Sequence, residues 1–142
     1  MISFNYELDF EIQNEEEYSH WITSVLLSEE KLEGEINYIF VDDDYLLDLN
    51  QKHLNHDTLT DVISFDYSLG NEIHGYIYIS IDRVRDNALD FNVTFEEELK
   101  RVMVHGILHY CGYRDKTEAD EQLIRSKEDE KIKMFHVKQI RY

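Results

Sequence analysis

The segment from Thr94 to Asp115 constrains the fold more than any other part of this sequence. Thr94 and Glu97 form the pattern of a capping box, which predicts that a helix begins at Phe95. The apolar residues of this helix recur at the spacing that gathers them on one face, and they are Phe95, Leu99, Val102, Met103 and Leu108. The helix is therefore expected to be largely buried.

The same helix carries two histidines, His105 and His109. Residues four apart lie within about 40° of each other around an α-helix and one turn apart along it, so both imidazoles project from one face. Two neutral imidazole nitrogens placed in this way can reach one Zn²⁺ at about 2.0–2.1 Å. Gly112 follows three residues after His109, where a glycine can take the left-handed conformation that turns the chain back. Asp115 would arrive by that return.

His105, His109 and Asp115 therefore form a candidate set of three ligands for one divalent metal ion. Three protein ligands leave a fourth position for water, which distinguishes a catalytic zinc site from a closed structural one. An isolated pair of histidines at this spacing is more often exposed or structural, but the glycine and the carboxylate favour the metal site. Two imidazoles and one carboxylate also suit Fe²⁺ or Mn²⁺, so zinc is favoured without being fixed.

Cys111 lies inside the same segment but points elsewhere. It is six residues after His105 and two after His109, which places it well over 100° around the helix from the first imidazole and opposite the second. We interpret it as a thiol of the core and not as a metal ligand.

Strands and helices alternate along the rest of the chain. Apolar alternation and turn residues predict strands at residues 2–12, 35–41, 62–67 and 74–81. Capping patterns and apolar stripes predict further helices at residues 14–27, 42–54, 82–89 and 117–136. A turn at Gly70-Asn71 would join the last two strands into a hairpin. The expected fold class is α+β, with a mixed four-stranded sheet packed with about five helices.

Length and composition predict a single domain over residues 1–142. A chain of 142 residues with 42% hydrophobic and 13% aromatic content can bury a sizeable core and is not typical of disorder. No apolar run approaches about 20 residues, and the N-terminus lacks the basic start and apolar block of a signal peptide. The single cysteine cannot form an internal disulfide. We therefore expect a cytoplasmic protein with no membrane partner.

The net charge of −17 is unfavourable for binding nucleic acid. Attraction to phosphates normally supplies most non-specific affinity, and an acidic protein lacks it unless positive charge is concentrated locally. A metal ion in a cleft would supply one such local charge. Much of the acidity lies in short runs that are expected on solvated faces and in first turns of helices, at residues 15–17, 42–44 and 96–98.

Further motifs accompany the histidines in a fixed order along the chain. They are Asn50, Thr60–Phe65, Gly75–Ile77, Ile79-Ser80, His105–His109 and Gly112-Tyr113. Over roughly residues 45 to 130 the chain resembles the YbeY endoribonucleases, which mature small-subunit ribosomal RNA. The resemblance implies a zincin-like metal-bearing helix and a single-strand-specific, zinc-dependent endoribonuclease. It also implies a role in 16S rRNA 3′-end maturation and ribosome quality control, with single-stranded RNA and the ribosome or ribosomal proteins as partners.

Three positions depart from the family pattern. Asp115 stands where the family uses a third histidine, and a carboxylate leaves less positive charge on the metal, so the bound water should be less acidified. Leu54 replaces an arginine, so that a phosphate contact is missing, and His56 stands where a lysine would be. Tyr76 replaces the aspartate of the usual Gly-Asp-Ile.

Two residues outside the ligand set are candidates for contact with RNA. His56, if able to donate a proton, could steady the scissile phosphate or the leaving group, although it could equally be an ordinary polar loop residue. Arg114 lies beside the proposed ligand Asp115 and could contact RNA, although a surface role is the simpler interpretation. The metal itself would polarise a phosphoryl oxygen, generate hydroxide from its water, or both.

Two other functions are compatible with such a metal site. Zincin peptidases place a glutamate immediately after the first histidine as general base, and this chain has Gly106 there, which disfavours peptide hydrolysis. A non-catalytic, metal-bound ribosome assembly factor is the other alternative, because an acidic surface would attract basic ribosomal proteins. The sequence does not indicate an oligomeric state.

Overall fold

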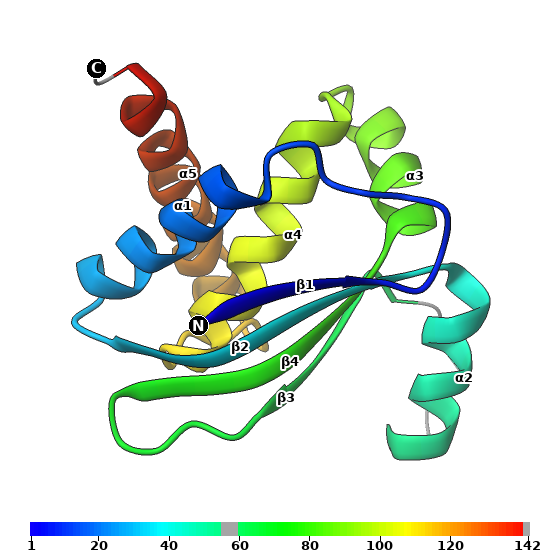
Figure 1. Cartoon of the computed structure of the whole chain (residues 1–142), viewed down its shortest axis with the longest axis horizontal. Helices are drawn as coiled ribbons and strands as arrows, with labels where there is room; N and C mark the ends of the chain where they lie inside the picture. Colours follow the sequence, from blue (N-terminus) through cyan, green and yellow to red (C-terminus); the bar gives the residue numbers. More distant parts are fainter. Residues whose placement is uncertain (55–59, 141–142) are drawn as a thin grey trace.

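In the computed structural model the chain forms a four-stranded mixed sheet with helices on both of its faces (Figure 1). The structure describes residues 1–54 and 60–140, with the side chains of residues 1–52 and 60–135. The strands are β1 (Ile2–Tyr6), β2 (Leu32–Val41), β3 (Val62–Asp66) and β4 (Glu72–Ser80). The helices are α1 (Glu15–Ser28), α2 (Asp43–Leu54), α3 (Ile81–Phe91), α4 (Phe95–Tyr110) and α5 (Glu118–Ile140). The predicted α+β class, with four strands and five helices in the described part, is confirmed.

The strands lie in the order β1-β2-β4-β3. β1 and β4 both run parallel to β2, whereas β3 runs antiparallel to β4 as the second member of the predicted hairpin. Gly70 in the hairpin turn has a φ of 61°, and Leu69 and Glu72 exchange two backbone hydrogen bonds of 3.0 Å across it. A glycine is suited to this position because it adopts a positive φ without steric cost.

The main core lies between one face of the sheet and helices α1 and α4. Figure 1 shows α4 crossing this face, with α5 packed behind α1 and α4, while α2 lies at the opposite face. Alternate side chains of β2 enter the core, and Met103 and Ile107 of α4 meet them there. Gly106 allows a close approach, because a Cβ at that position would lie 3.2 Å from the Ile77 side chain of β4. The predicted burial of α4 is therefore confirmed.

The first strand is shorter than the alternation of residues 2–12 predicts. β1 is an edge strand that pairs with β2, and Tyr6 lies opposite Phe40 in their register. Because β2 ends at Val41, it offers almost no backbone for β1 to pair with beyond Tyr6. The chain then leaves the sheet. Phe10 packs against the core and Ile12 is buried there, which is why the apolar pattern continues after the strand has ended.

Other predicted boundaries also move. β2 begins at Leu32 and includes Gly34, β4 begins at Glu72, α3 ends at Phe91, and α5 extends to Ile140. Asn14 does not cap α1 with its side chain; its amide donates to the Glu17 carboxylate at 2.8 Å instead. The Thr94 and Thr117 caps form as predicted.

The two threonine hydroxyls accept hydrogen bonds from backbone N–H groups, of Glu97 at 3.1 Å and of Asp120 at 3.0 Å respectively. Such caps satisfy donors that the first turn of a helix leaves unpaired. They fix the starts of α4 and α5, the two helices that build the site described below. Within the described residues, no helix is both long and apolar enough to cross a membrane.

Candidate metal centre

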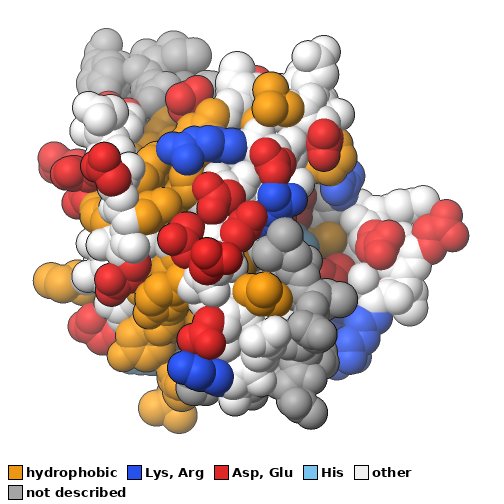
Figure 2. Space-filling view, turned by 90° about the vertical axis from the view of Figure 1, so that its right-hand side faces the viewer, with side chains coloured by type: hydrophobic (Ala, Val, Ile, Leu, Met, Phe, Trp, Pro, Cys, Tyr) orange, Lys and Arg blue, Asp and Glu red, His pale blue; other side chains and the backbone are white. Residues whose placement is uncertain are grey.

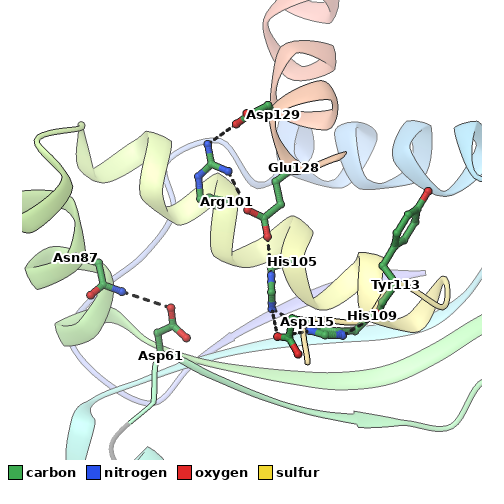
Figure 3. Close-up of polar contacts among 9 residues, drawn as sticks. All are labelled: Asp61, Asn87, Arg101, His105, His109, Tyr113, Asp115, Glu128 and Asp129. Carbon is green, nitrogen blue, oxygen red and sulfur yellow. Dashed lines mark hydrogen bonds and ion pairs between the residues drawn. The ribbon is translucent and has the colours of Figure 1, made fainter. Parts of the chain in front are cut away.

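The end of α4 and the loop after it bring His105, His109 and Asp115 together (Figure 3). The two histidines lie in the last turns of α4, which ends at Tyr110. Gly112 then takes a φ of 104°, the positive value that its predicted turn requires. The Tyr113 N–H closes this turn by donating to the Leu108 carbonyl at 3.1 Å. The chain is thereby reversed, and Asp115 faces the histidines.

The distances among the three candidate ligand atoms suit a small divalent ion. The Nε2 atoms of His105 and His109 are 2.9 Å apart. Oδ2 of Asp115 lies 3.4 Å from the first and 3.2 Å from the second. A tetrahedral zinc with bonds of about 2.0–2.1 Å separates its ligand atoms by about 3.3 Å. The three atoms therefore need to move only by tenths of an ångström to surround such an ion.

The hydrogen-bond partner of each outer ring nitrogen sets the tautomer that the neutral ring adopts. Nδ1 of His109 donates to the Tyr113 carbonyl at 3.0 Å, and a carbonyl can only accept. Nδ1 of His105 donates to the Glu128 carboxylate at 2.6 Å. In the neutral form of these two tautomers, the lone pairs of both Nε2 atoms point at each other and at a carboxylate oxygen. A divalent cation between the three atoms would accept all of these lone pairs, so the residues fit such a metal.

Glu128 is the buried partner of this centre. Its carboxylate comes from α5 with only 5% of the side chain exposed, and its second oxygen accepts from Arg101 at 2.8 Å. Arg101 also binds Asp129 at 2.7 Å. Burial by itself lowers the pKa of His105, but the hydrogen bond and charge of Glu128, with the charges of Asp115 and Asp61, raise it above its ordinary value.

A cavity of about 410 Å³ opens beside His105 and Asp115. Its walls come from the start of β3 and from α3, α4 and α5. Asp61 lines it from the position just before β3, and its carboxylate accepts a 3.4 Å hydrogen bond from Asn87 of α3. Glu98 of α4 also lines the cavity, and burial raises the pKa of both carboxyls. The cavity is large enough to admit part of a substrate at the metal.

Three other residues of the sequence analysis bear on this site: His56, Arg114 and Cys111. His56 lies outside the described residues. Arg114 is exposed on the loop that carries Asp115 and, in the described part of the chain, is not among the residues that line the cavity. Cys111 follows α4 as its C-cap residue and packs against the core, and burial raises its pKa to about 11. Its place against the core agrees with the interpretation as a core thiol.

Gly106 occupies the position of the zincin glutamate and faces the sheet. A Cβ added there would lie 3.2 Å from the Ile77 side chain of β4. Glycine has no side chain that could serve as the general base of the zincin route, which disfavours peptide hydrolysis by that route.

Sequence reasoning missed the residues that support the ligands. Glu128 lies in a helix rich in charges, where nothing local distinguishes it from its exposed neighbours. Asp61, by contrast, lies within the Thr60–Phe65 motif, whose position before a strand could have indicated a site residue. The pairing of Glu128 with His105 joins two helices and is visible only in three dimensions.

Comparison with known proteins identifies relatives over nearly the whole chain. A family model described as Endoribonuclease YbeY matches residues 3–136. A protein named Endoribonuclease YbeY from Flavobacterium psychrophilum is 76% identical, covering 98% of this chain and 99% of its own. A relative of the same name from Flavobacterium johnsoniae is 66% identical, covering 98% and 100%. The solution structure of TM1509 from Thermotoga maritima superposes with a TM-score of 0.72 and 28% identity, covering 98% and 91%.

Proposed function

The chain belongs to the YbeY family of endoribonucleases, and we propose that it uses one bound divalent metal, zinc, to cleave single-stranded RNA. We place this activity in the 3′-end maturation of 16S rRNA and in ribosome quality control, in the cytoplasm. The observation that carries the proposal is the convergence of His105, His109 and Asp115 beside an open cavity. Two imidazoles and a carboxylate form a donor set of the catalytic type, which leaves a position for water or substrate.

Each residue of the centre has a separate task in this proposal. His105, His109 and Asp115 hold the ion, which when bound supplies a Lewis acid and an acidified water. Glu128 and the Tyr113 carbonyl keep both Nδ1 atoms protonated, so that both Nε2 atoms remain available as ligands. Asp61 lies in the cavity with a raised pKa, and its carboxyl is placed to take up or return a proton during cleavage.

The acidity of the chain shapes how it must meet RNA. With a net charge of −17, the protein gains little from general attraction to phosphates. Two cations, Arg101 and Arg125, line the cavity, but carboxylates line it as well. We propose that basic ribosomal proteins bring this enzyme to its substrate, because they are attracted by the same acidic surface that repels free RNA.

A metal-bound assembly factor without catalytic activity is the second candidate, and the net charge favours it. A direct assay distinguishes the two functions. Its three substrates are a single-stranded RNA, the duplex of the same sequence, and an unstructured protein. We expect cleavage of the single strand alone, abolished by a chelator. His105→Ala should remove the activity, and His20→Ala, a change at an exposed histidine of α1, should leave it intact.

The cellular role requires a second measurement. Cells that lack the gene should accumulate 16S rRNA with unprocessed 3′ ends, detected by mapping those ends, and expression of the His105→Ala variant should not correct them. Correct processing by that variant, together with no cleavage of RNA by the purified protein, would establish the assembly factor instead. Normal 3′ ends in the deletion strain would contradict the role in rRNA maturation.

A further inference from the structure

We propose that α5 positions both histidines of the metal centre through two buried charged residues one helical turn apart, Glu128 and Lys131. Glu128 acts on His105 directly, and Lys131 acts on His109 through Glu29 and Tyr113. The inference rests on the proposed function in so far as these histidines hold a metal. It goes further by assigning positioning residues to a helix that contributes none of the ligands.

The first connection is a single hydrogen bond between helices. Glu128 of α5 reaches His105 of α4, with 2.6 Å between Oε2 and Nδ1 (Figure 3). Arg101, one turn before His105 on α4, binds the other oxygen of Glu128 at 2.8 Å and Asp129 at 2.7 Å. A buried carboxylate is stable only when its charge is paired, and Arg101 supplies that pairing. Glu128 is thereby fixed, and its bond to Nδ1 sets the rotation and the tautomer of the His105 ring.

The second connection begins at the Lys131 ammonium, whose side chain is only 2% exposed. Its three N–H donors meet three acceptors: Glu29 at 2.8 Å, Ser28 at 2.9 Å and Glu130 at 2.8 Å. Burial by itself lowers the pKa of Lys131, but Glu130 and Glu29 raise it above its ordinary value, so the ammonium stays charged. Lys131 thus ties the end of α1 to α5.

Glu29 links Lys131 to Tyr113, which contacts the metal centre. Its other oxygen accepts from the Tyr113 hydroxyl at 2.8 Å. The backbone carbonyl of Tyr113 accepts from Nδ1 of His109 at 3.0 Å. The position of Tyr113 therefore depends on a side chain held by α5, and the orientation of His109 depends on Tyr113. Outer partners of metal-bound histidines orient the ligand in this way, and their loss commonly lowers metal affinity by about 10–100-fold.

The test measures metal binding and leaves RNA cleavage aside. The variants are Glu128→Gln, Lys131→Met and Tyr113→Phe, where the last removes the hydroxyl but keeps the carbonyl that His109 uses. Matched controls are Glu118→Gln and Lys133→Met, which make the same chemical changes at exposed positions of α5. The readouts are the dissociation constant for Zn²⁺, by competition with a chromophoric chelator, and the visible absorption spectrum of bound Co²⁺.

We expect Glu128→Gln to weaken Zn²⁺ binding by about 10–100-fold and to change the Co²⁺ spectrum. Lys131→Met and Tyr113→Phe should each weaken binding by a few-fold to about 10-fold, while both controls behave like the wild type. Because Lys131 and Tyr113 lie on one connection, their double variant should lose no more affinity than the stronger single variant. Thermal unfolding of the metal-free variants identifies any that fail to fold.

The inference is overturned if folded Glu128→Gln and Tyr113→Phe both bind Zn²⁺ within twofold of the wild type with an unchanged Co²⁺ spectrum. It is also overturned if Lys133→Met weakens binding as much as Lys131→Met. Its failure is distinct from failure of the proposed function. A wild-type protein that binds Zn²⁺ but cleaves no RNA contradicts the function and leaves the positioning role in place.

Discussion

At the scale of single residues, Asp115 as a metal ligand would set how much positive charge the bound ion retains. Its carboxylate oxygen lies 3.2–3.4 Å from both histidine nitrogens, so it belongs to the same donor set. A negative ligand neutralises part of the charge that acidifies a bound water. The family pattern places a neutral imidazole there instead. This one position is therefore expected to tune the pH range of the reaction without removing the metal.

Asp115→His tests this expectation through the pH dependence of cleavage. The replacement leaves more positive charge on the ion, so the bound water should ionise at a lower pH. The rising limb of the plot of kcat/KM against pH should move to lower pH than in the wild type, with the metal content maintained. A rising limb that stays in place or moves to higher pH would contradict the argument.

Asp61 offers a second test at this scale. Burial raises the pKa of its carboxyl, which keeps a proton available at a higher pH than an exposed aspartate would. If that proton takes part in cleavage, Asp61→Asn should lower kcat by about 10²–10⁴-fold while Zn²⁺ binding stays near the wild-type value. The rate of single-turnover cleavage, with metal affinity measured in parallel, tests whether Asp61 takes part in the reaction. Undiminished kcat would restrict Asp61 to a structural role beside Asn87.

At the scale of secondary-structure elements, α4 illustrates which features can be predicted from the sequence and which cannot. Its start, its burial and the pairing of His105 with His109 follow from capping and helical periodicity, which are local properties. The length of β1 cannot be predicted from local sequence, because it is set by the partner strand, with which the pairing ends at Tyr6. The support from Glu128 does not follow either, since it joins residues on two different helices.

Gly112 turns the chain at the end of α4, and its backbone conformation brings the following loop back to that helix. Its φ of 104° is disfavoured for any other residue, although no atom would obstruct an added Cβ. Gly112→Ala should therefore destabilise the fold by about 1–2 kcal/mol through backbone strain alone. It should also weaken Zn²⁺ binding, because Asp115 moves with the turn. Chemical denaturation and metal titration measure the two effects separately.

A matched change at Gly70 serves as the control for this strain. Gly70 also has a positive φ, 61°, and open space around it, but it lies in the hairpin turn away from α4. Gly70→Ala should cost similar stability and leave metal affinity unchanged. Equal losses of affinity in the two variants would mean that strain, and not the placement of Asp115, explains the effect.

At the scale of the whole molecule, the distribution of charge sets the conditions for RNA binding. Figure 2 shows one face, where acidic side chains gather and basic ones are scattered among them. With a net charge of −17, the surface as a whole repels phosphates. A metal ion held by the three candidate ligands would be a local positive charge within an acidic protein, in contrast to a basic RNA-binding groove.

Salt should therefore affect this enzyme in an unusual direction. Basic nucleic-acid-binding proteins lose affinity steeply between about 50 and 200 mM salt, because bound counterions are released. Here added salt screens repulsion, so the KM for a short single-stranded RNA should stay constant or fall over that range. Glu121→Gln, which removes one charge from the cavity wall, should also lower the KM. A steep rise of KM with salt would reveal a basic RNA-binding surface.

The central claim is that His105, His109 and Asp115 hold one metal ion on which cleavage depends. Its most direct test is titration of chelator-treated protein with Zn²⁺ while cleavage of single-stranded RNA is followed. We predict that activity rises linearly and reaches its plateau at one equivalent of metal. The His105→Ala and His109→Ala double variant should show no recovery. Cleavage by metal-free wild-type protein, or full recovery in the double variant, would contradict the claim.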